Sequence, residues 1–144
     1  MNIGDYKDSF LTEAREYLSA LNNSLVLLEK DQAQSEAIHE IFRAAHTLKG
    51  MAATMGYDPM VRLTHQMETV LEPIRSGTRS ISTGIVDVLF TCLDQLEKWV
   101  EDLMSQDFIE EENLPSLLGQ LQAIWKQKTV STLSGFDESA PEAE

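Results

Sequence analysis

Apolar residues recur every three or four positions through most of the chain, and this spacing restricts the fold more than any other feature. Four segments, at about residues 5–30, 34–55, 59–76 and 83–103, each carry such a stripe. In the second segment it runs through Ile38, Ile41, Ala45, Leu48, Ala52 and Met55. Stripes of this kind pack between antiparallel helices, so we predict an all-α protein whose four long helices form an antiparallel bundle. A shorter helix, opened by Asn113-Leu114-Pro115, is predicted to follow as the fifth.

Glycine, proline and capping residues mark the ends of these segments. Gly56 suits the left-handed position that ends a helix, and Asp58 can cap the helix that follows, which predicts a tight helical hairpin. Pro73 falls in the last turn of the third segment, where it can kink the helix or end it early. Ser82 or Thr83 is predicted to open the fourth helix.

Charge and composition exclude several classes of function. Eleven Lys and Arg residues against 24 Asp and Glu give 11 − 24 = −13, a charge that repels nucleic acids. Cys92 is the single cysteine, so no internal disulfide or Cys-based zinc site can form, which favours a reducing compartment. The N-terminus has no signal-peptide pattern and no stretch is apolar enough to span a membrane. We therefore expect a soluble, cytoplasmic protein without nucleic-acid binding or membrane insertion.

The last residues differ in composition from the rest of the chain. From about Thr129 the apolar stripe disappears, and the final SGFDESAPEAE segment holds four acids and no base. We predict one domain over residues 1–128 and an acidic flexible linker over residues 129–144 that leads towards further domains.

The segment Arg43-Ala44-Ala45-His46-Thr47-Leu48-Lys49-Gly50 is the candidate functional site, because core packing does not require its polar residues. His46 follows the stripe residue Ala45 directly and so belongs at the edge of the core, partly open to water. Gly50 comes one helical turn later and leaves no side chain over the imidazole. A glycine inside a helix costs about 1 kcal/mol relative to alanine, and close approach by another molecule is one reason for it. Lys49 and Arg43 would by themselves be ordinary surface charges.

Counting outward from Tyr57, the centre of the hairpin, predicts which side chains face each other. His46 stands 11 residues before Tyr57 and Glu68 11 after it, while Lys49 stands eight before and His65 eight after. A carboxylate level with His46 could accept its Nδ1–H, leaving Nε2 unprotonated and outward as a nucleophile. Lys49 could then offset negative charge that arrives at that nitrogen.

Two other functions stay open at this point. A carboxylate-bridged di-metal enzyme needs two Glu-x-x-His pairs and two further Glu residues on a helix bundle. Only Glu36 and His39 have this spacing, while His65 and Glu68 stand in the reverse order, so we expect no metal site. A non-catalytic helical adaptor, in which His46 is incidental, is the other alternative.

The stretch FRAAHTLKGMAATMGY, followed by HQMETVL, resembles the histidine phosphotransfer domain of CheA-type chemotaxis kinases. On this resemblance His46 matches the phosphorylated histidine and Glu68 the carboxylate that holds its Nδ1. Lys49 and His65 match the surrounding polar residues, and Gly50 matches the family's glycine after the lysine. We expect Gly50 and Arg43 to lie where partners dock.

The resemblance extends over about residues 5–127 and includes the order of the five helices. It implies a phosphocarrier: His46 accepts a phosphoryl group from an ATP-bound kinase domain, acting in trans and belonging to the same polypeptide within a dimer, and donates it to an aspartate of a CheY-like response regulator. The chain has no GxxxxGK[ST] or other Gly-rich phosphate loop. We therefore expect no cofactor on this domain, with ATP and Mg²⁺ held by partner domains.

Overall fold

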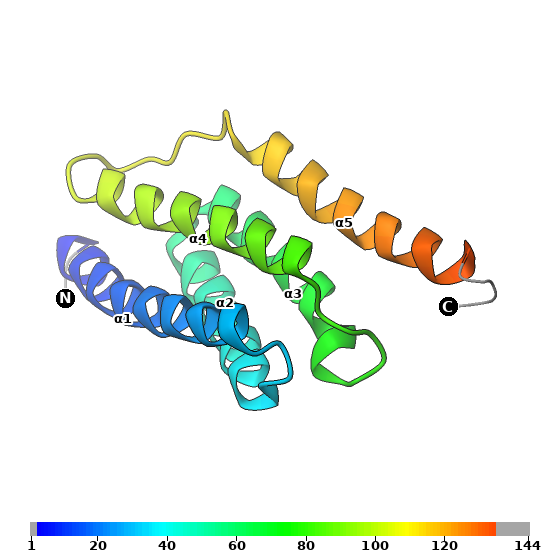
Figure 1. Cartoon of the computed structure of the whole chain (residues 1–144). Coiled ribbons are helices and arrows are strands. Elements are labelled where there is room, and N and C mark those ends of the chain that lie inside the picture. Colours follow the sequence, from blue (N-terminus) through cyan, green and yellow to red (C-terminus); the bar gives the residue numbers. More distant parts are fainter. Residues whose placement is uncertain (1–2, 135–144) are drawn as a thin grey trace.

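Five helices make up the part of the chain that the computed structural model describes, which is residues 3–134, with side chains described for residues 4–126 (Figure 1). They are α1 (Ile3–Lys30), α2 (Ser35–Met55), α3 (Asp58–Arg75), α4 (Thr83–Leu103) and α5 (Leu114–Ser134). No strand occurs among these described residues. The predicted all-α class and the order of the five helices are confirmed.

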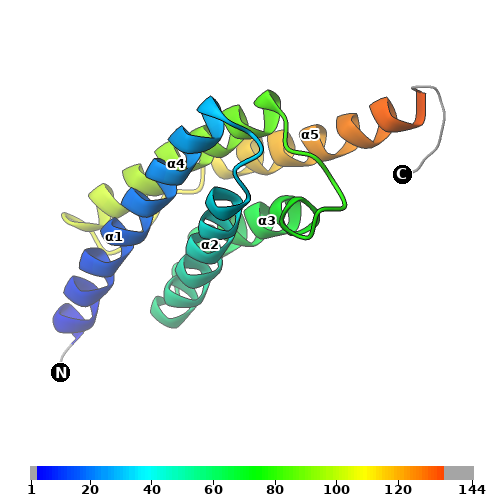
Figure 2. The ribbon, with the colours of Figure 1, turned by 60° about the horizontal axis from the view of Figure 1, so that its bottom comes forward.

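The first four helices form the predicted bundle. Helix α1 packs against α2 and α4, and α2 packs against α3. Helices α3 and α4 contact each other sparsely, and α5 lies against both of them. Figures 1 and 2 show α1 and α4 side by side, with α1 beginning at one end of the molecule and α5 ending at the other. Since α5 packs on α3 and α4 alone, it leaves the outer side of the α2–α3 pair uncovered in the described chain.

The predicted apolar stripes form one continuous core. In α2 the stripe residues Ile41, Ala45 and Ala52 are completely buried. In α4 the large ring of Trp99 is buried as well, and its Nε1–H donates to the carbonyl oxygen of Glu110 at 2.9 Å. Full burial of one large apolar side chain contributes about 1.5–3 kcal/mol to stability. The close-packed core therefore holds the helices in one relative position and fixes which residues of α2 and α3 face each other.

A glycine-terminated turn sets the register of the α2–α3 hairpin. Gly56 has φ 78° and ψ 20°, in the left-handed region that favours glycine. Its N–H donates to the carbonyl of Ala53 at 3.1 Å, and the N–H of Tyr57 donates to that of Ala52 at 2.9 Å, which together form a Schellman motif. The ring of Tyr57 packs edge-on against Phe10 of α1, with 5.2 Å between ring centroids. The turn is thus tied both to α2 and to the core.

Three predictions about helix ends have different outcomes. Ser82 caps α4 as predicted, because its side chain accepts the N–H of Ile85 at 3.2 Å. The prediction that Asp58 caps α3 is wrong: Asp58 is already the first helical residue, and no side chain caps this end. Pro73 does not end α3, which continues to Arg75. The carbonyl of Pro73 accepts the backbone N–H groups of Thr78 and Arg79 in the following loop, and these bonds close the helix end.

The prediction that the fifth helix is shorter than the others is wrong: α5 has 21 residues, as many as α2 and α4. It also extends past residue 128, the predicted end of the domain. It runs through Ser134, although the sequence from Thr129 onward carries no apolar stripe. No proline or glycine stands between Gly119 and Ser134, so nothing in that stretch breaks the helical backbone. The rest of the predicted linker, residues 135–144, lies outside the described residues. Among the described residues, no helix combines the length and apolar character that a membrane crossing requires.

Candidate functional site

Three polar side chains meet on the uncovered side of the α2–α3 hairpin, and we refer to them as the His46 cluster: His46 and Lys49 from α2, and Glu68 from α3. The Nδ1 atom of His46 lies 2.5 Å from Oε2 of Glu68. The Nζ atom of Lys49 lies 2.6 Å from Oε1 of the same carboxylate. Because each partner uses a different oxygen, Glu68 holds both α2 side chains at once.

The hairpin explains why these residues meet. Ala45 and Leu48 are buried in the core, so the residues that follow them, His46 and Lys49, stand at the edge of the buried face of α2. The contact between His46 and Glu68 is the one predicted by counting equal distances from Tyr57. Lys49, which the same count places level with His65, makes no hydrogen bond or ion pair with it among the described residues. The long lysine side chain reaches instead to Glu68, one turn after His65 on α3, because the carboxylate attracts its positive charge.

Opposing effects act on the Glu68 carboxyl, whose side chain is 10% exposed. Burial raises its pKa, but the hydrogen bonds and positive charge from Lys49, and then those from His46, outweigh burial and hold the pKa of Glu68 below its usual value. Glu68 is therefore an ionised carboxylate at neutral pH. Since an ionised carboxylate only accepts hydrogen bonds, Nδ1 of His46 must carry the proton and donate it.

The geometry leaves the other ring nitrogen available. In neutral imidazole a proton on Nδ1 makes Nε2 an unprotonated base. The side chain of His46 is 63% exposed, although its Nδ1 is held by a carboxylate that is nearly buried. A Cβ placed on Gly50, one turn further along α2, would meet nothing within 4 Å. This glycine is thus not required by internal packing, and its position leaves no side chain standing beside the His46 imidazole.

The ring of Phe42 lies next to His46, and a cation of α3, Arg75, lies over that ring; neither residue is among the predicted site residues. The ring of Phe42 is nearly parallel to the imidazole, at 6° between planes and 6.3 Å between centroids. The guanidinium carbon of Arg75 lies 4.5 Å from the centroid of the Phe42 ring. The same count from Tyr57 could have indicated them, since it places Phe42 level with Glu72, one turn before Arg75.

The two remaining predicted residues lie outside the His46 cluster. His65 is exposed, and its imidazole makes no hydrogen bond or ion pair with any side chain described in residues 4–126. Arg43 is also exposed and pairs with Glu40 of the same helix at 3.0 Å. His65 stands one turn before Glu68 on α3, so it is a neighbour of the cluster without being bonded to it.

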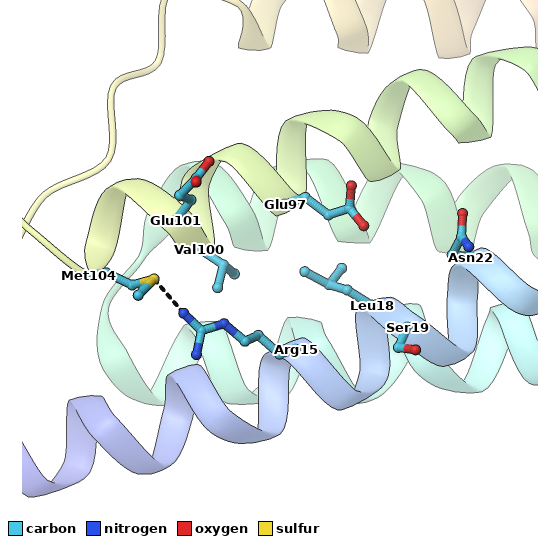
Figure 3. A pocket seen from close by; sticks show the side chains of 8 residues that line it. All are labelled: Arg15, Leu18, Ser19, Asn22, Glu97, Val100, Glu101 and Met104. Atoms are coloured by element: carbon cyan, nitrogen blue, oxygen red, sulfur yellow. Dashed lines mark hydrogen bonds between the residues drawn. The ribbon is translucent and has the colours of Figure 1, made fainter.

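A pocket of about 420 Å³ lies elsewhere, between α1 and the end of α4 (Figure 3). Glu97 and Glu101 line one side of it, and Arg15 reaches across from α1 to the sulfur of Met104. None of the predicted site residues lines this pocket. Within the described residues, no group of three His, Cys, Asp or Glu side chains is placed to hold a metal ion.

Comparisons with known proteins agree with this description of the fold. A family model described as the Hpt domain matches residues 5–103. The chain is similar to the chemotaxis protein CheA of Bacillus subtilis, with 46% identity over 104 residues, which cover 72% of this chain and 16% of that protein. It is also similar to the solved CheA phosphotransferase domain from Thermotoga maritima, with 38% identity and a TM-score of 0.69, over 73% of this chain and 100% of that one.

A second solved structure has the same fold at lower identity. It is the phosphorylated P1 domain of CheA3 in complex with CheY6 from R. sphaeroides, with 22% identity, a TM-score of 0.80 and coverage of 86% of this chain and 98% of that one. The chain spans about one sixth of the length of the B. subtilis protein, so it corresponds to one domain of a relative that is much longer. The family match and the Thermotoga structure together show that the chain belongs to the Hpt domain family, among the phosphotransfer domains of CheA-type proteins.

Proposed function

We propose that this chain is a phosphocarrier in which His46 accepts a phosphoryl group that originates in ATP and passes it to an aspartate of a response regulator. The observation that carries the proposal is the hydrogen bond from Nδ1 of His46 to the nearly buried carboxylate of Glu68. This bond fixes the tautomer and leaves Nε2 as an exposed nucleophile in a defined orientation.

In the accepting step the lone pair of Nε2 attacks the γ-phosphorus of ATP. The N–P bond forms, the bond from the γ-phosphorus to the bridging oxygen breaks, and ADP leaves with that electron pair. The ring then carries substituents on both nitrogens and becomes positively charged. Glu68 stabilises this charge through the hydrogen bond that it already accepts, so no group of the site has to move.

In the donating step a carboxylate oxygen of the regulator's aspartate attacks the same phosphorus. The N–P bond breaks and its electron pair returns to Nε2, which restores the starting tautomer. Lys49 stands one turn from His46 and is 29% exposed, so its charge can offset the negative charge of the phosphoryl group in both steps. His65 and Arg43 are proposed to assist from the edge of the site, and Gly50 to leave room for the docking proteins.

The proposal requires two partners. The described helices contain no phosphate-binding loop, so a kinase domain must hold ATP and Mg²⁺ and act on His46 in trans, which a dimer of the longer relatives would permit. The recipient is proposed to be a CheY-like regulator, the class of protein bound in the solved R. sphaeroides complex. Because ATP is the phosphoryl source, we place the reaction in the cytoplasm.

The test is to incubate the chain with a CheA-type kinase core that lacks its own phosphotransfer domain, together with γ-labelled ATP, and then to add a CheY-like regulator. We expect an acid-labile label on the wild-type chain, no label on His46→Gln, and transfer of the label to the regulator's aspartate. Absence of label on the wild-type chain would support the helical adaptor instead. Label that persists on His46→Gln would move the acceptor to another residue, with His65 the first to examine.

A further inference from the structure

The Phe42 ring contacts both the nucleophilic histidine and a cation of the neighbouring helix. Its plane lies 6° from that of His46, and the guanidinium of Arg75 covers it at 4.5 Å from its centroid. Glu72 holds this guanidinium in turn, because both of its carboxylate oxygens lie 2.8 Å from the Nη2 atom of Arg75. We refer to Phe42, Arg75 and Glu72 as the Phe42 clamp.

The hairpin register shows on which side of the ring each partner lies. Counted from Tyr57, Glu72 is level with Phe42, whereas Arg75 is level with His39, one turn further from His46. Arg75 therefore approaches Phe42 from the end of the hairpin opposite to His46. Side chains on a helix lean towards its N-terminus, which directs the imidazole of His46 back onto Phe42, four residues earlier. The aromatic ring thus stands between the cation and the imidazole.

The clamp restrains a motion that the hydrogen bond to Glu68 leaves free. One hydrogen bond at Nδ1 prevents the imidazole from flipping, but the ring can still tilt about the line from Nδ1 to the Glu68 carboxylate. Tilt moves Nε2, which must point along the axis of the bond that breaks at phosphorus. A parallel ring on one face opposes tilt, and Phe42 can do so only if it is itself fixed. Since Phe42 is only partly buried, the core alone does not fix it.

We infer that Phe42, held in place by Arg75 and Glu72, is a positioning residue that sets the direction of the Nε2 lone pair of His46 for phosphoryl transfer. The inference rests on the proposed function. It assigns to the clamp an effect on the rate of the chemical step and none on the docking of the kinase.

The test compares Arg75→Gln with Arg75→Lys, using Arg62→Gln as the matched control. Arg62 is also on α3 and also pairs with a glutamate, but its partner is Glu111 and it is not part of the clamp. For each chain we would measure kcat and KM as substrate of a separate kinase core, the nuclear Overhauser effect between the Phe42 and His46 rings, and the melting temperature. Both Arg75 and Arg62 are at the surface, so all three variants should fold.

We expect Arg75→Gln to lower kcat about three- to tenfold with KM unchanged, and to weaken the nuclear Overhauser effect between the Phe42 and His46 rings. Arg75→Lys keeps a cation over Phe42 and should recover part of the loss, while Arg62→Gln should match the wild type. Phe42→Leu should lower kcat at least as much, and Arg75→Gln should add little to it, because the two residues act through one contact.

Three results would overturn the inference. The first is wild-type kcat and a wild-type ring contact in Arg75→Gln. The second is a rise in KM at constant kcat, which would make Arg75 a docking residue. The third is an equal loss in Arg62→Gln. Labelling of the wild-type chain distinguishes failure of this inference from failure of the proposed function. If the wild-type chain is not labelled, the proposed function itself fails. If it is labelled, these three results bear on the role of the Phe42 clamp alone.

Discussion

The charge of one residue, Glu68, decides how the site works, because its two oxygens hold different side chains of α2. We predict that Glu68→Gln slows phosphoryl acceptance without abolishing it. The amide can still accept the Nδ1–H bond, but it cannot stabilise the charge that develops on the ring. A hydrogen bond to a charged group exceeds a neutral one by about 1–2 kcal/mol, or roughly 5- to 30-fold in rate. Initial rates with a separate kinase core measure this, with the exposed Glu111→Gln as control. An unchanged rate would remove Glu68 from the mechanism.

The same carboxylate makes stability depend on pH in a defined direction. In the folded chain the pKa of Glu68 lies below its ordinary value of 4.5, because the hydrogen bonds from Lys49 and His46 outweigh its burial. Its contribution to the free energy of unfolding is therefore complete above that value and is lost as pH falls through the folded pKa. Denaturant unfolding of wild type and Glu68→Gln between about pH 3 and 7 should show the difference between them narrowing only at the acid end. A difference that widens as pH falls would contradict this.

Residues at the site were predictable where backbone register alone decides the contact. His46 and Glu68 face each other because Gly56 fixes the turn and both side chains are short, so counting from Tyr57 was sufficient. Counting from Tyr57 failed for Lys49, because its long side chain extends past the level of His65 and pairs with the Glu68 carboxylate. Phe42 stands four residues before His46 on the same helix, but its contact with Arg75 depends on side-chain packing between helices, which spacing does not determine.

At the scale of the helix, a substitution at Gly50 shows whether the missing side chain on α2 gives partner proteins access to His46. We predict that Gly50→Leu raises the free energy of unfolding by about 1 kcal/mol, because leucine is the better helix former and no atom lies within 4 Å of the added Cβ. It should also lower the rates of acceptance and of donation by about tenfold or more, since a bulky group beside His46 holds both partners away.

Gly119 of α5 provides a matched control, because it too is exposed and has nothing within 4 Å of an added Cβ. Gly119→Leu should give the same gain in stability and leave both rates unchanged. Loss of stability in Gly50→Leu that parallels its loss of activity would show that Gly50 serves packing and has no role in access.

Helix identity was predictable from periodicity, whereas helix ends depended on local chemistry. The stripes predicted the four helices of the bundle, and Gly56 and Ser82 behave as their residue types indicate. Asp58 does not cap because the helix starts one residue earlier than a cap would require. In α5 the helical backbone continues to Ser134 although the apolar stripe ends near residue 128, so the stripe alone does not mark where this helix ends.

In the whole molecule the bundle acts as a rigid support and the chemistry is confined to one face. Helix α5 covers the side where α3 and α4 contact sparsely, while no described helix packs over the side that carries the His46 cluster. Family comparisons place the same fold within much longer proteins. We propose that residues 129–144 serve there as a tether, which would raise the effective concentration of His46 near an attached kinase domain.

This role predicts the effect of removing the tail. A chain that ends at Lys128 should melt within about 3 °C of one that ends at Glu144, which corresponds to less than about 1 kcal/mol. It should also accept phosphate from a separate kinase core at the same rate, because the described contacts of α5 with the bundle involve earlier residues such as Trp125. A larger loss in either quantity would mean that the part of α5 from Thr129 onward packs on the bundle and that the domain extends beyond residue 128.

The central claim is that phosphate is carried on one atom, Nε2 of His46, while Nδ1 keeps its proton for Glu68. The most direct test is a long-range ¹H–¹⁵N correlation spectrum of the ¹⁵N-labelled domain, recorded before and after phosphorylation by a kinase core, with His46→Gln as the control. We predict that a single histidine, His46, changes, that phosphorus couples to its Nε2, and that its Nδ1 stays protonated. Phosphorus on Nδ1, on His39 or on His65, or an equal change in His46→Gln, would contradict it.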